Sequence, residues 1–463
     1  MKPTLASAIL STAVPLAMLS GCDSDSAAED PATPDNALAA YVAKADDSYG
    51  WKVRRDGKVG PAEWVELTVT SQMWRDIEWK HQLFLIRPST AREDCRHAVL
   101  FIAGGSWSDR LAQPPAEDEE LPRQAAVFAG LAEQMKTPVA VVLQVPHQPL
   151  FDGRYEDAII AYTFEQYLQT GDAEWPLLLP MTKAAAAAMD AVGEYAQQKW
   201  KRKIDRFTVT GASKRGWTTW LIGAVDKRAV ALAPTVIDML KIDEHLALQK
   251  KSWGEYSPQL RDYTERGLPR HLATEGGRAL TRMVDPIHYA AKYRQPTLII
   301  LGTNDAYWPL DAANLYWDDL TQPKYLLYVP NNGHGIRDYA RTFGALRALH
   351  HHVALDKPLP NLGWKFAEKN GAVRVTMDSY VRPAAVRLWT ATASKRDFRE
   401  ANFKPTDELA SLTPPDAAIS RCIYVRDVRL PESGYLAVFG EYRFEDADGP
   451  YYFSTNVRIY GAP

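Results

Sequence analysis

The sequence has little cysteine, no excess of either charge and no long apolar run beyond its N-terminus, and each lack excludes a class of protein. Its 463 residues include only three cysteines, none of them in the spacing of a zinc site or a dense disulfide framework. The 54 Lys and Arg nearly balance the 57 Asp and Glu, so the net charge is −3 and no basic stripe is present to bind phosphates. We therefore expect neither a metal site nor a nucleic-acid partner.

The apolar run at the N-terminus is too short to span a membrane but fits the core of a signal peptide. It follows Lys2 and ends in Leu19-Ser20-Gly21-Cys22, which resembles a bacterial lipobox. We expect residues 1–22 to be a lipoprotein signal peptide with Cys22 lipidated, and residues 23–48 to be a flexible tether. The body would then be lipid-anchored to a membrane of the bacterial cell envelope and face the periplasm. With an ordinary secretory signal and an incidental Cys22, the protein would be secreted.

The other two cysteines, Cys95 and Cys422, lie far apart in the chain. An oxidising compartment permits a disulfide between them, which would join distant segments. Two buried thiols fit the sequence equally well, because the geometry that a disulfide needs cannot be read from spacing. Both alternatives stay open at this point.

Short apolar strands alternate with amphipathic helices through most of the chain, which is typical of the α/β class. At 46% hydrophobic residues, the chain has enough apolar side chains for a globular body. Continuous runs such as Ala98–Ile102 and Thr297–Leu301 indicate strands buried on both faces, and Thr182–Lys199 has a helical pattern. We predict an α/β-hydrolase domain over residues 49–357, with a mostly parallel sheet and a helical cap inserted at about 240–293.

The pattern changes in the last hundred residues. Segments such as Val373–Met377 and Tyr435–Val438 are short, rich in β-branched and aromatic residues, and separated by turn residues. These features predict an antiparallel β-sandwich domain over residues 358–463.

A strand, a glycine-flanked serine and a helix follow one another around Ser213. The sequence Phe207–Trp217 has the context of a nucleophile elbow, in which a sharp strand-to-helix turn presents the serine hydroxyl above a sheet. It departs from Gly-x-Ser-x-Gly because Arg215 stands at the second glycine position and Gly216 comes one residue later. The motif predicts that Ser213 is a nucleophile, provided that an acid and a histidine follow it.

Both partners follow Ser213 in the chain order of α/β hydrolases. Asp305 comes just after the strand Thr297–Leu301, and His334 follows a later apolar strand, so both would lie in loops at the carboxyl ends of parallel strands. His334 would act as the general base, and Asp305 would orient it. Asp238, at the end of the preceding strand, is the alternative acid, although a helix cap or a salt bridge also accounts for it.

An oxyanion hole needs preorganised N–H groups near the nucleophile. Lys214, the residue after the serine, would supply one, and the loop Gly104–Trp107 after an early strand would supply the other through Gly105 or Ser106. Glycines in such loops are also common as simple turn residues.

Several longer strings resemble one known family. Asp157–Phe164, Trp175–Lys183 and Thr210–Leu221 look like segments of the PhoPQ-activated pathogenicity-related proteins, and the resemblance continues to the C-terminal β region. It implies an exported bacterial protein with an α/β-hydrolase domain, related to the autocrine proliferation repressor proteins of slime moulds, and it implies no substrate. The elbow is also similar to that of glucuronoyl esterases, where a basic residue beside the nucleophile assists the oxyanion; this resemblance suggests that role for Lys214 or Arg215.

These observations favour a serine hydrolase that cleaves an ester or amide through an acyl-enzyme and needs no cofactor. Arg215, Trp107, Glu156 and Asp157 are candidates for substrate contacts, the two acids as a pair that binds an amine or as ordinary charge at a helix start. A small molecule, a peptide or a glycan ester would fit, and esterase and peptidase are not separable here. The alternative is a non-catalytic binding or signalling protein on the same scaffold. A dinucleotide-dependent oxidoreductase is excluded, because no G-x-G-x-x-G follows a strand.

Overall fold

A large twisted sheet organises the computed structural model, which describes residues 33–462 apart from 117 and 414–420. The predicted signal peptide, the lipidation site Cys22 and the first part of the predicted tether lie outside the described residues. Residues from Thr33 onward form one compact unit.

Six parallel strands form the middle of the sheet, in the order β5-β4-β6-β7-β8-β9. Three antiparallel strands, β1 to β3, extend it beyond β5. The bounds are β1 Gly50–Val59, β2 Ala62–Trp74, β3 Ile77–Arg87, β4 His97–Ile102, β5 Val139–Val142, β6 Arg206–Ala212, β7 Ala229–Thr235, β8 Thr297–Gly302 and β9 Lys324–Val329.

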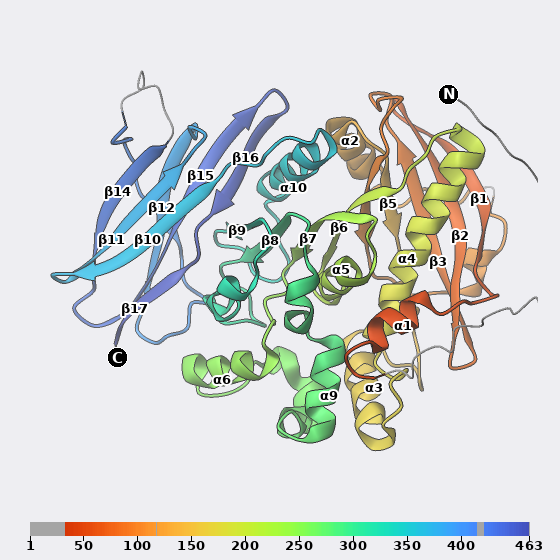
Figure 1. Ribbon diagram of the computed structural model, residues 1–463, viewed down its shortest axis with the longest axis horizontal. Coiled ribbons are helices and arrows are strands. Elements are labelled where there is room, and N and C mark those ends of the chain that lie inside the picture. Colours follow the sequence, from red (N-terminus) through yellow and green to blue (C-terminus); the bar gives the residue numbers. More distant parts are fainter. Residues whose placement is uncertain (1–32, 117, 414–420, 463) are drawn as a thin grey trace, which may run out of the picture. The chain divides into compact units, whose positions relative to one another are not determined.

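Helices cover both faces of this sheet, because the parallel strands are apolar on both sides (Figure 1). Along β4, Ala98, Leu100 and Ile102 join the core on the face of α4 and α5, whereas Val99 joins the core on the face of α2 and α10. The bounds are α2 Ala125–Met135, α3 Asp157–Thr170, α4 Leu178–Tyr195, α5 Lys214–Val225 and α10 Tyr339–Ala354. The predicted α/β-hydrolase class with a mostly parallel sheet is confirmed.

A short helix, α1 (Ala37–Ala43), lies within residues 23–48, where the sequence analysis predicts a flexible tether. Leu38 is fully buried and Tyr41 nearly so, and the Tyr41 hydroxyl donates to Gln72 at 2.9 Å. The tether prediction is therefore wrong for this segment, because its three apolar residues share one helical face that packs on α4. Acidic residues flank this segment, so its short apolar face is hard to recognise in the sequence.

Between β7 and β8 the chain leaves the sheet and forms a cluster of helices beside α3 (Figure 1). Its main elements are α6 Ile242–Trp253, α7 Arg261–Glu265, α8 Leu268–His271 and α9 Glu275–Val284. We call these helices the cap. The predicted insertion at about 240–293 corresponds to this interval.

The C-terminal strands form two sheets, one of which continues the central sheet. The first pairs through β16 with β9 of the central sheet, at Ser454 and Leu326, and β10, β11 and β14 form the second. Residues 358–463 therefore share a sheet with the predicted hydrolase domain. The bounds are β10 Leu362–Lys369, β11 Ala372–Ser379, β12 Ala385–Ala393, β13 Lys404–Pro405, β14 Cys422–Arg429, β15 Gly434–Asp446, β16 Gly449–Ser454 and β17 Arg458–Ala462.

Three further features concern the expectations about cysteines, membranes and metals. Cys95 and Cys422 are both free thiols, so the disulfide alternative does not hold in this structure. Among the described residues, no helix has the length and apolar character to cross a membrane. The same residues contain no cluster of His, Cys, Asp and Glu suited to a metal ion.

Candidate active site

Ser213 occupies a one-residue turn between β6 and α5. Its backbone has φ 58° and ψ −128°, a conformation that an L-residue adopts only at a cost of about 1–3 kcal/mol and that recurs at functional sites. Its amide donates to the Thr235 carbonyl on β7 at 2.8 Å, which fixes the turn to the sheet. The serine is partly exposed, although α5 behind it is buried.

The two glycines of the elbow are needed where the backbones approach most closely. A Cβ at Gly211 would lie 2.6 Å from the Arg215 carbonyl oxygen, and one at Gly216 would lie 2.9 Å from the carbonyl oxygens of Gly211 and Thr235. The second position of this elbow that has no room for a side chain is therefore residue 216. This explains why Arg215 can occupy the position that holds glycine in Gly-x-Ser-x-Gly.

Asp305 and His334, from two different loops, meet at the carboxyl end of the sheet. His334 Nδ1 lies 2.8 Å from Asp305 Oδ2 and 3.1 Å from Oδ1. A carboxylate can only accept, so Nδ1 carries the hydrogen and Nε2 is left with a free lone pair. No described residue, Ser213 included, donates to Nε2, which is itself buried. The imidazole is thus held in the tautomer that a general base requires.

Neighbouring groups hold the pair in place. Asp305 is only 6% exposed and also accepts from the Tyr307 amide at 2.9 Å. The Tyr307 ring lies against the His334 ring, with centroids 4.2 Å apart. The loop that carries His334 packs tightly on β8, since a Cβ at Gly302 would lie 2.4 Å from the Asn332 carbonyl oxygen.

Asp238, the alternative acid, is bound elsewhere. It is 2% exposed, and its carboxyl accepts from the Tyr316 hydroxyl at 2.7 Å. Burial, with a further contribution from the negative charge of Asp305, raises the pKa of Asp238 to about 8. A carboxyl that is largely protonated at neutral pH cannot stabilise an imidazolium. The geometry therefore favours Asp305 as the partner of His334.

The loop after β4 presents its backbone near the elbow. Gly105, with φ +123°, and Ser106 are both exposed, and the Gly105 carbonyl accepts from Gln148 Nε2 at 3.1 Å. Because the peptide is planar and trans, the Ser106 N–H points away from that carbonyl and from Gln148. The amides of Ser106 and Lys214 have no acceptor among the described residues, so both are free to bind an anion.

Glu156 connects that loop to the elbow through a network of charges. Its carboxylate binds the Arg215 guanidinium through two contacts of 2.6 and 2.7 Å, and Lys214 Nζ lies 2.8 Å away. Gln148 both donates to this carboxylate and accepts from the Glu156 amide. Burial opposes ionisation of Glu156, but Arg215 and Lys214 outweigh it and lower its pKa to about 2. Glu156 itself has the same backbone conformation as Ser213, with φ 53° and ψ −126°.

The predicted substrate contacts are therefore largely occupied by one another. Arg215 is buried, also donates to the Val145 carbonyl, and lies against Gly104, where a Cβ would be 2.5 Å from its guanidinium. Asp157 accepts from the Tyr263 hydroxyl at 3.0 Å and lies 3.4 Å from Lys214. With their charges compensated, the two acids do not form an open anionic pair for an amine. Trp107 donates from its indole to Asp109.

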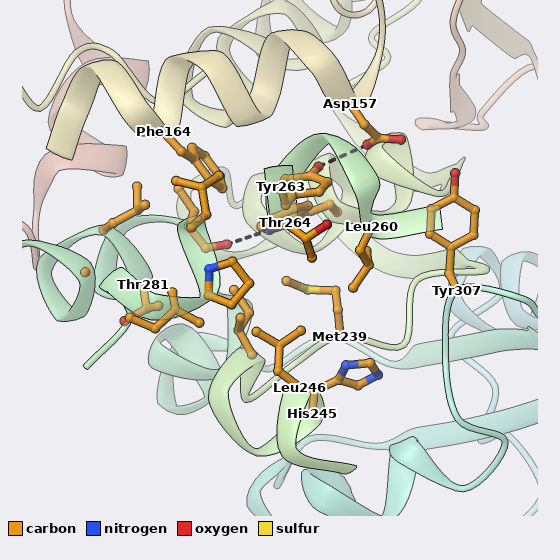
Figure 2. A pocket seen from close by; sticks show the side chains of 18 of the residues that line it. Asp157, Phe164, Met239, His245, Leu246, Leu260, Tyr263, Thr264, Thr281 and Tyr307 are labelled. Atoms are coloured by element: carbon orange, nitrogen blue, oxygen red, sulfur yellow. Dashed lines mark hydrogen bonds between the residues drawn. The ribbon is translucent and has the colours of Figure 1, made fainter. Parts of the chain in front are cut away.

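Ser213 and Lys214 line a cavity of about 100 Å³ whose wall also includes residues of the cap. Figure 2 shows part of this wall, with Asp157, Phe164 and Leu246 labelled. Asp157 and Tyr263 lie at its polar end, and most of its remaining wall is apolar. The apolar wall comes from α3, from α5, and from the cap helices with the segments that lead into them, and it includes Phe164, Trp217, Met239, Leu246, Leu260 and Leu280. Such a space suits an apolar group attached to a reacting carbonyl.

The two loops that carry Asp305 and His334 are also tied to more distant segments. Ser257 and Gln249 of the cap donate to the carbonyls of Ala306 and Tyr307. The side-chain amide of Asn304 donates to three backbone carbonyls in the C-terminal region, those of Phe398, Arg399 and Ala401.

Asn331, on the loop that carries His334, exchanges two hydrogen bonds of 2.9 and 2.7 Å with the Phe403 backbone. The segment that precedes β13 therefore contacts both loops. The C-terminal region thus takes part in positioning Asp305 and His334.

Several of these residues are missed by sequence reasoning. Gln148, Tyr307, Asn304 and Asn331 have no distinctive spacing, because their roles depend on contacts between segments far apart in the chain. The pairs Asn304-Asp305 and Asn331-Asn332 beside the predicted site are the signal that could have pointed to such bracing, since asparagine both donates and accepts.

The chain is similar to proteins of one family and to several esterase structures. Residues 38–399 match the model of the PhoPQ-activated pathogenicity-related proteins. Autocrine proliferation repressor protein A of Dictyostelium discoideum is 29% identical over 433 residues, which cover 87% of this chain and 84% of that protein.

The similar solved structures include acetyl xylan esterase 1 from Thermoanaerobacterium sp. and a glucuronoyl esterase from Solibacter usitatus. The first is 18% identical with a TM-score of 0.44, over 68% of this chain and 92% of that one. The second is 13% identical with a TM-score of 0.41, over 68% of this chain and 91% of that one.

Proposed function

The chain belongs to the PhoPQ-activated pathogenicity-related protein family, and we propose that this member is an exported serine hydrolase that cleaves an ester or amide through an acyl-enzyme. Ser213 is the nucleophile, His334 the general base and Asp305 the group that orients it. The observation that carries the proposal is the hydrogen bond from His334 Nδ1 to Asp305, which leaves a buried Nε2 lone pair that receives no donor from the described residues. A histidine with a purely structural role is expected to use both nitrogens.

The reaction follows from these roles. Ser213 Oγ attacks the substrate carbonyl while His334 Nε2 takes the hydroxyl proton, and Asp305 stabilises the imidazolium that forms. The Lys214 and Ser106 amides receive the negative oxygen of the tetrahedral intermediate. The intermediate collapses, and the departing alcohol or amine takes the proton from His334. Water then attacks the acyl-enzyme by the same route and releases the acid.

The Glu156 network gives the oxyanion site its rigidity. Lys214 and Arg215 follow the nucleophile directly, and both are fixed through Glu156, which Gln148 joins to the Gly105 carbonyl. In this arrangement the ion pairs of Lys214 and Arg215 with Glu156 fix the backbone amides of Lys214 and Ser106 relative to each other. The side chains of Lys214 and Arg215 therefore assist the oxyanion indirectly, by positioning the backbone N–H groups that bind it.

The proposal covers small-molecule, peptide and glycan esters, because it places only the group attached to the reacting carbonyl in the cavity. The export route is also part of it: the lipobox-like Leu19–Cys22 supports lipidation at Cys22 and a position in the cell envelope, facing the periplasm.

Trapping of the acyl-enzyme tests the proposal. The protein from residue 23 onward is mixed with p-nitrophenyl esters of short acids, quenched in acid and analysed by intact mass and peptide mapping. We expect a burst of nitrophenol and an acyl group on the peptide that contains Ser213, both absent from Ser213→Ala. Ser89→Ala, which changes an exposed serine bound to Glu133 far from the elbow, is the matched control and should keep the burst.

The alternative, a binding or signalling protein on this scaffold, predicts the opposite result. A folded wild-type protein that shows no burst and no acyl adduct with any ester of the panel would favour it.

A further inference from the structure

His245 is a buried polar residue in an otherwise apolar part of the cavity wall. It lies on α6, is 2% exposed and lines the same cavity as Ser213. Its Nε2 is buried without a partner, and neither ring nitrogen makes a hydrogen bond within the described part of the chain. An unpaired buried polar group costs about 1–3 kcal/mol, and because His245 lines a cavity, a ligand bound there can supply the missing partner.

The described residues around His245 pack against its ring but give it no hydrogen-bond partner. Trp308 packs edge-on against the imidazole, with centroids 5.0 Å apart. Met239 and Leu246 line the cavity beside it, and in the view of Figure 2 Met239 lies between His245 and Tyr263. His245 is therefore separated by apolar side chains from the polar end of the cavity at Asp157 and Tyr263.

The imidazole is uncharged at neutral pH, because burial lowers the pKa of His245 to about 3. A neutral imidazole has one donor and one acceptor. Among the described lining residues, the carboxylate of Asp157 is already engaged by Tyr263 and Lys214, so no free counter-ion is available for a charged substituent. A hydroxyl, which can donate and accept, matches His245 without introducing charge.

The cavity also limits the size of its occupant. At about 100 Å³ it is smaller than the about 150 Å³ engineered cavity that holds benzene in another protein. A substituent of a few carbons fits directly, and a single ring requires a small movement of the cap.

We propose that the cavity under the cap binds a substrate substituent that is apolar except for one hydroxyl, and that this hydroxyl hydrogen-bonds His245. The proposal rests on the proposed function, because it makes His245 a specificity-determining residue for the group attached to the carbonyl that Ser213 attacks.

Matched esters that differ only in a hydroxyl or a methyl group test the proposal. The pairs are p-nitrophenyl 3-hydroxybutanoate with 3-methylbutanoate, and (4-hydroxyphenyl)acetate with (4-methylphenyl)acetate, each rate being corrected for alkaline hydrolysis. For at least one pair we expect kcat/KM of the wild type to favour the hydroxyl by about ten-fold or more, since the methyl analogue leaves the imidazole unpaired.

Three variants show whether that preference comes from His245. His245→Leu removes donor and acceptor, and the preference should fall to about one or below. His245→Gln keeps a donor and an acceptor and should restore part of the preference. Leu246→Met reshapes the same wall without changing hydrogen bonding, so its preference should stay near that of the wild type.

A binding measurement separates this proposal from the proposed function. Ser213→Ala is titrated with N-methyl-3-hydroxybutanamide, the corresponding phenolic amide and their methyl analogues, and the ¹⁵N shift of His245 is followed. Tighter binding of a hydroxyl amide, lost in the double variant with His245→Leu, supports the proposal even if the wild type hydrolyses no ester. Equal binding within both pairs overturns it, whether or not Ser213 proves catalytic.

Discussion

Asp238 and Asp305 follow neighbouring parallel strands, β7 and β8, and both are almost completely buried, yet their environments differ. Asp305 accepts from a histidine and from a backbone amide on a loop that the cap and the C-terminal region both hold. Asp238 accepts from the Tyr316 phenol, and burial raises its pKa to about 8. The comparison teaches that the position after a strand is not enough to assign a catalytic acid; the donors that surround the carboxyl decide its charge.

The largest expected effect comes from exchanging each acid for its amide. Asp305→Asn should lower kcat by about 10⁴-fold, because an amide can hold the wrong tautomer of His334. Asp238→Asn should keep kcat within a few-fold of the wild type, since its carboxyl is already largely neutral. Steady-state hydrolysis of a model ester measures both. Similar losses in the two variants, or a larger loss in Asp238→Asn, would contradict the assignment of Asp305 as the catalytic acid.

A smaller effect is expected from loosening the loop that carries Asp305. Asn304→Ala leaves the carbonyls of Arg399 and Ala401 without their donor and the Phe398 carbonyl with only the Ala401 amide, so the free energy of unfolding should fall by about 3 kcal/mol. We expect kcat to fall by about ten- to a hundred-fold with little change in KM, because the His334–Asp305 geometry is then less well held.

Asn361→Ala, at an exposed asparagine whose side chain makes no hydrogen bond among the described residues, is the control for this change. Denaturant unfolding and kinetics are measured on both variants. An unchanged kcat in Asn304→Ala would show that the C-terminal segment does not position the site.

The pH dependence of the free energy of unfolding tests whether Asp238 is protonated in the folded protein. The folded-state pKa of Asp238, about 8, lies above the unfolded value near 3.9, so its protonated form favours folding at low pH. That contribution is complete below about pH 4 and is lost as the pH rises towards 8. Asp238→Asn removes the titrating carboxyl, so the variant should not lose this contribution as the pH rises. Between pH 5 and pH 9 its free energy of unfolding, relative to that of the wild type, should therefore rise by about 2 kcal/mol or more.

Urea unfolding of the wild type and Asp238→Asn at several pH values measures this gain. Parallel stability curves across that range would mean that Asp238 is ionised in the folded protein and that its difference from Asp305 is smaller than the structure indicates.

The smallest expected effect is that of the phenol beside Asp238. Tyr316→Phe removes one buried hydrogen bond and should cost about 1 kcal/mol of stability while leaving kcat unchanged. Thermal unfolding and ester hydrolysis on the same preparation check both statements. A large loss of activity would connect Asp238 to the reaction after all.

Much of this framework could be predicted from local sequence. The elbow at Ser213 and the loops of Asp305 and His334 follow buried strands, and the carboxyl ends of parallel strands meet at one edge, so chain order alone placed these residues near each other. The choice between Asp238 and Asp305 could not be made, because both occupy equivalent positions and only Tyr316 and His334 tell them apart.

Other features depend on contacts that spacing does not encode. Arg215 resembles a substrate-binding residue in the sequence, but its guanidinium folds back onto Glu156 and Val145. The pairing of β16 with β9, which continues the central sheet into the C-terminal region, is a long-range event that alternating residues cannot specify. His245 is an ordinary helical histidine in the sequence, and only the fold shows that neither ring nitrogen bonds to a residue that the structure describes.

Labelling with a fluorophosphonate probe tests the central claim most directly, because it reports an activated serine without requiring a known substrate. The protein from residue 23 onward, Ser213→Ala and Asp305→Asn are treated in parallel, and the adduct is located by peptide mapping. We predict a single adduct on Ser213 in the wild type, none in Ser213→Ala and strongly slowed labelling in Asp305→Asn. A folded wild-type protein that stays unlabelled, or an adduct on another serine, would contradict the assignment of Ser213, His334 and Asp305 as a catalytic triad.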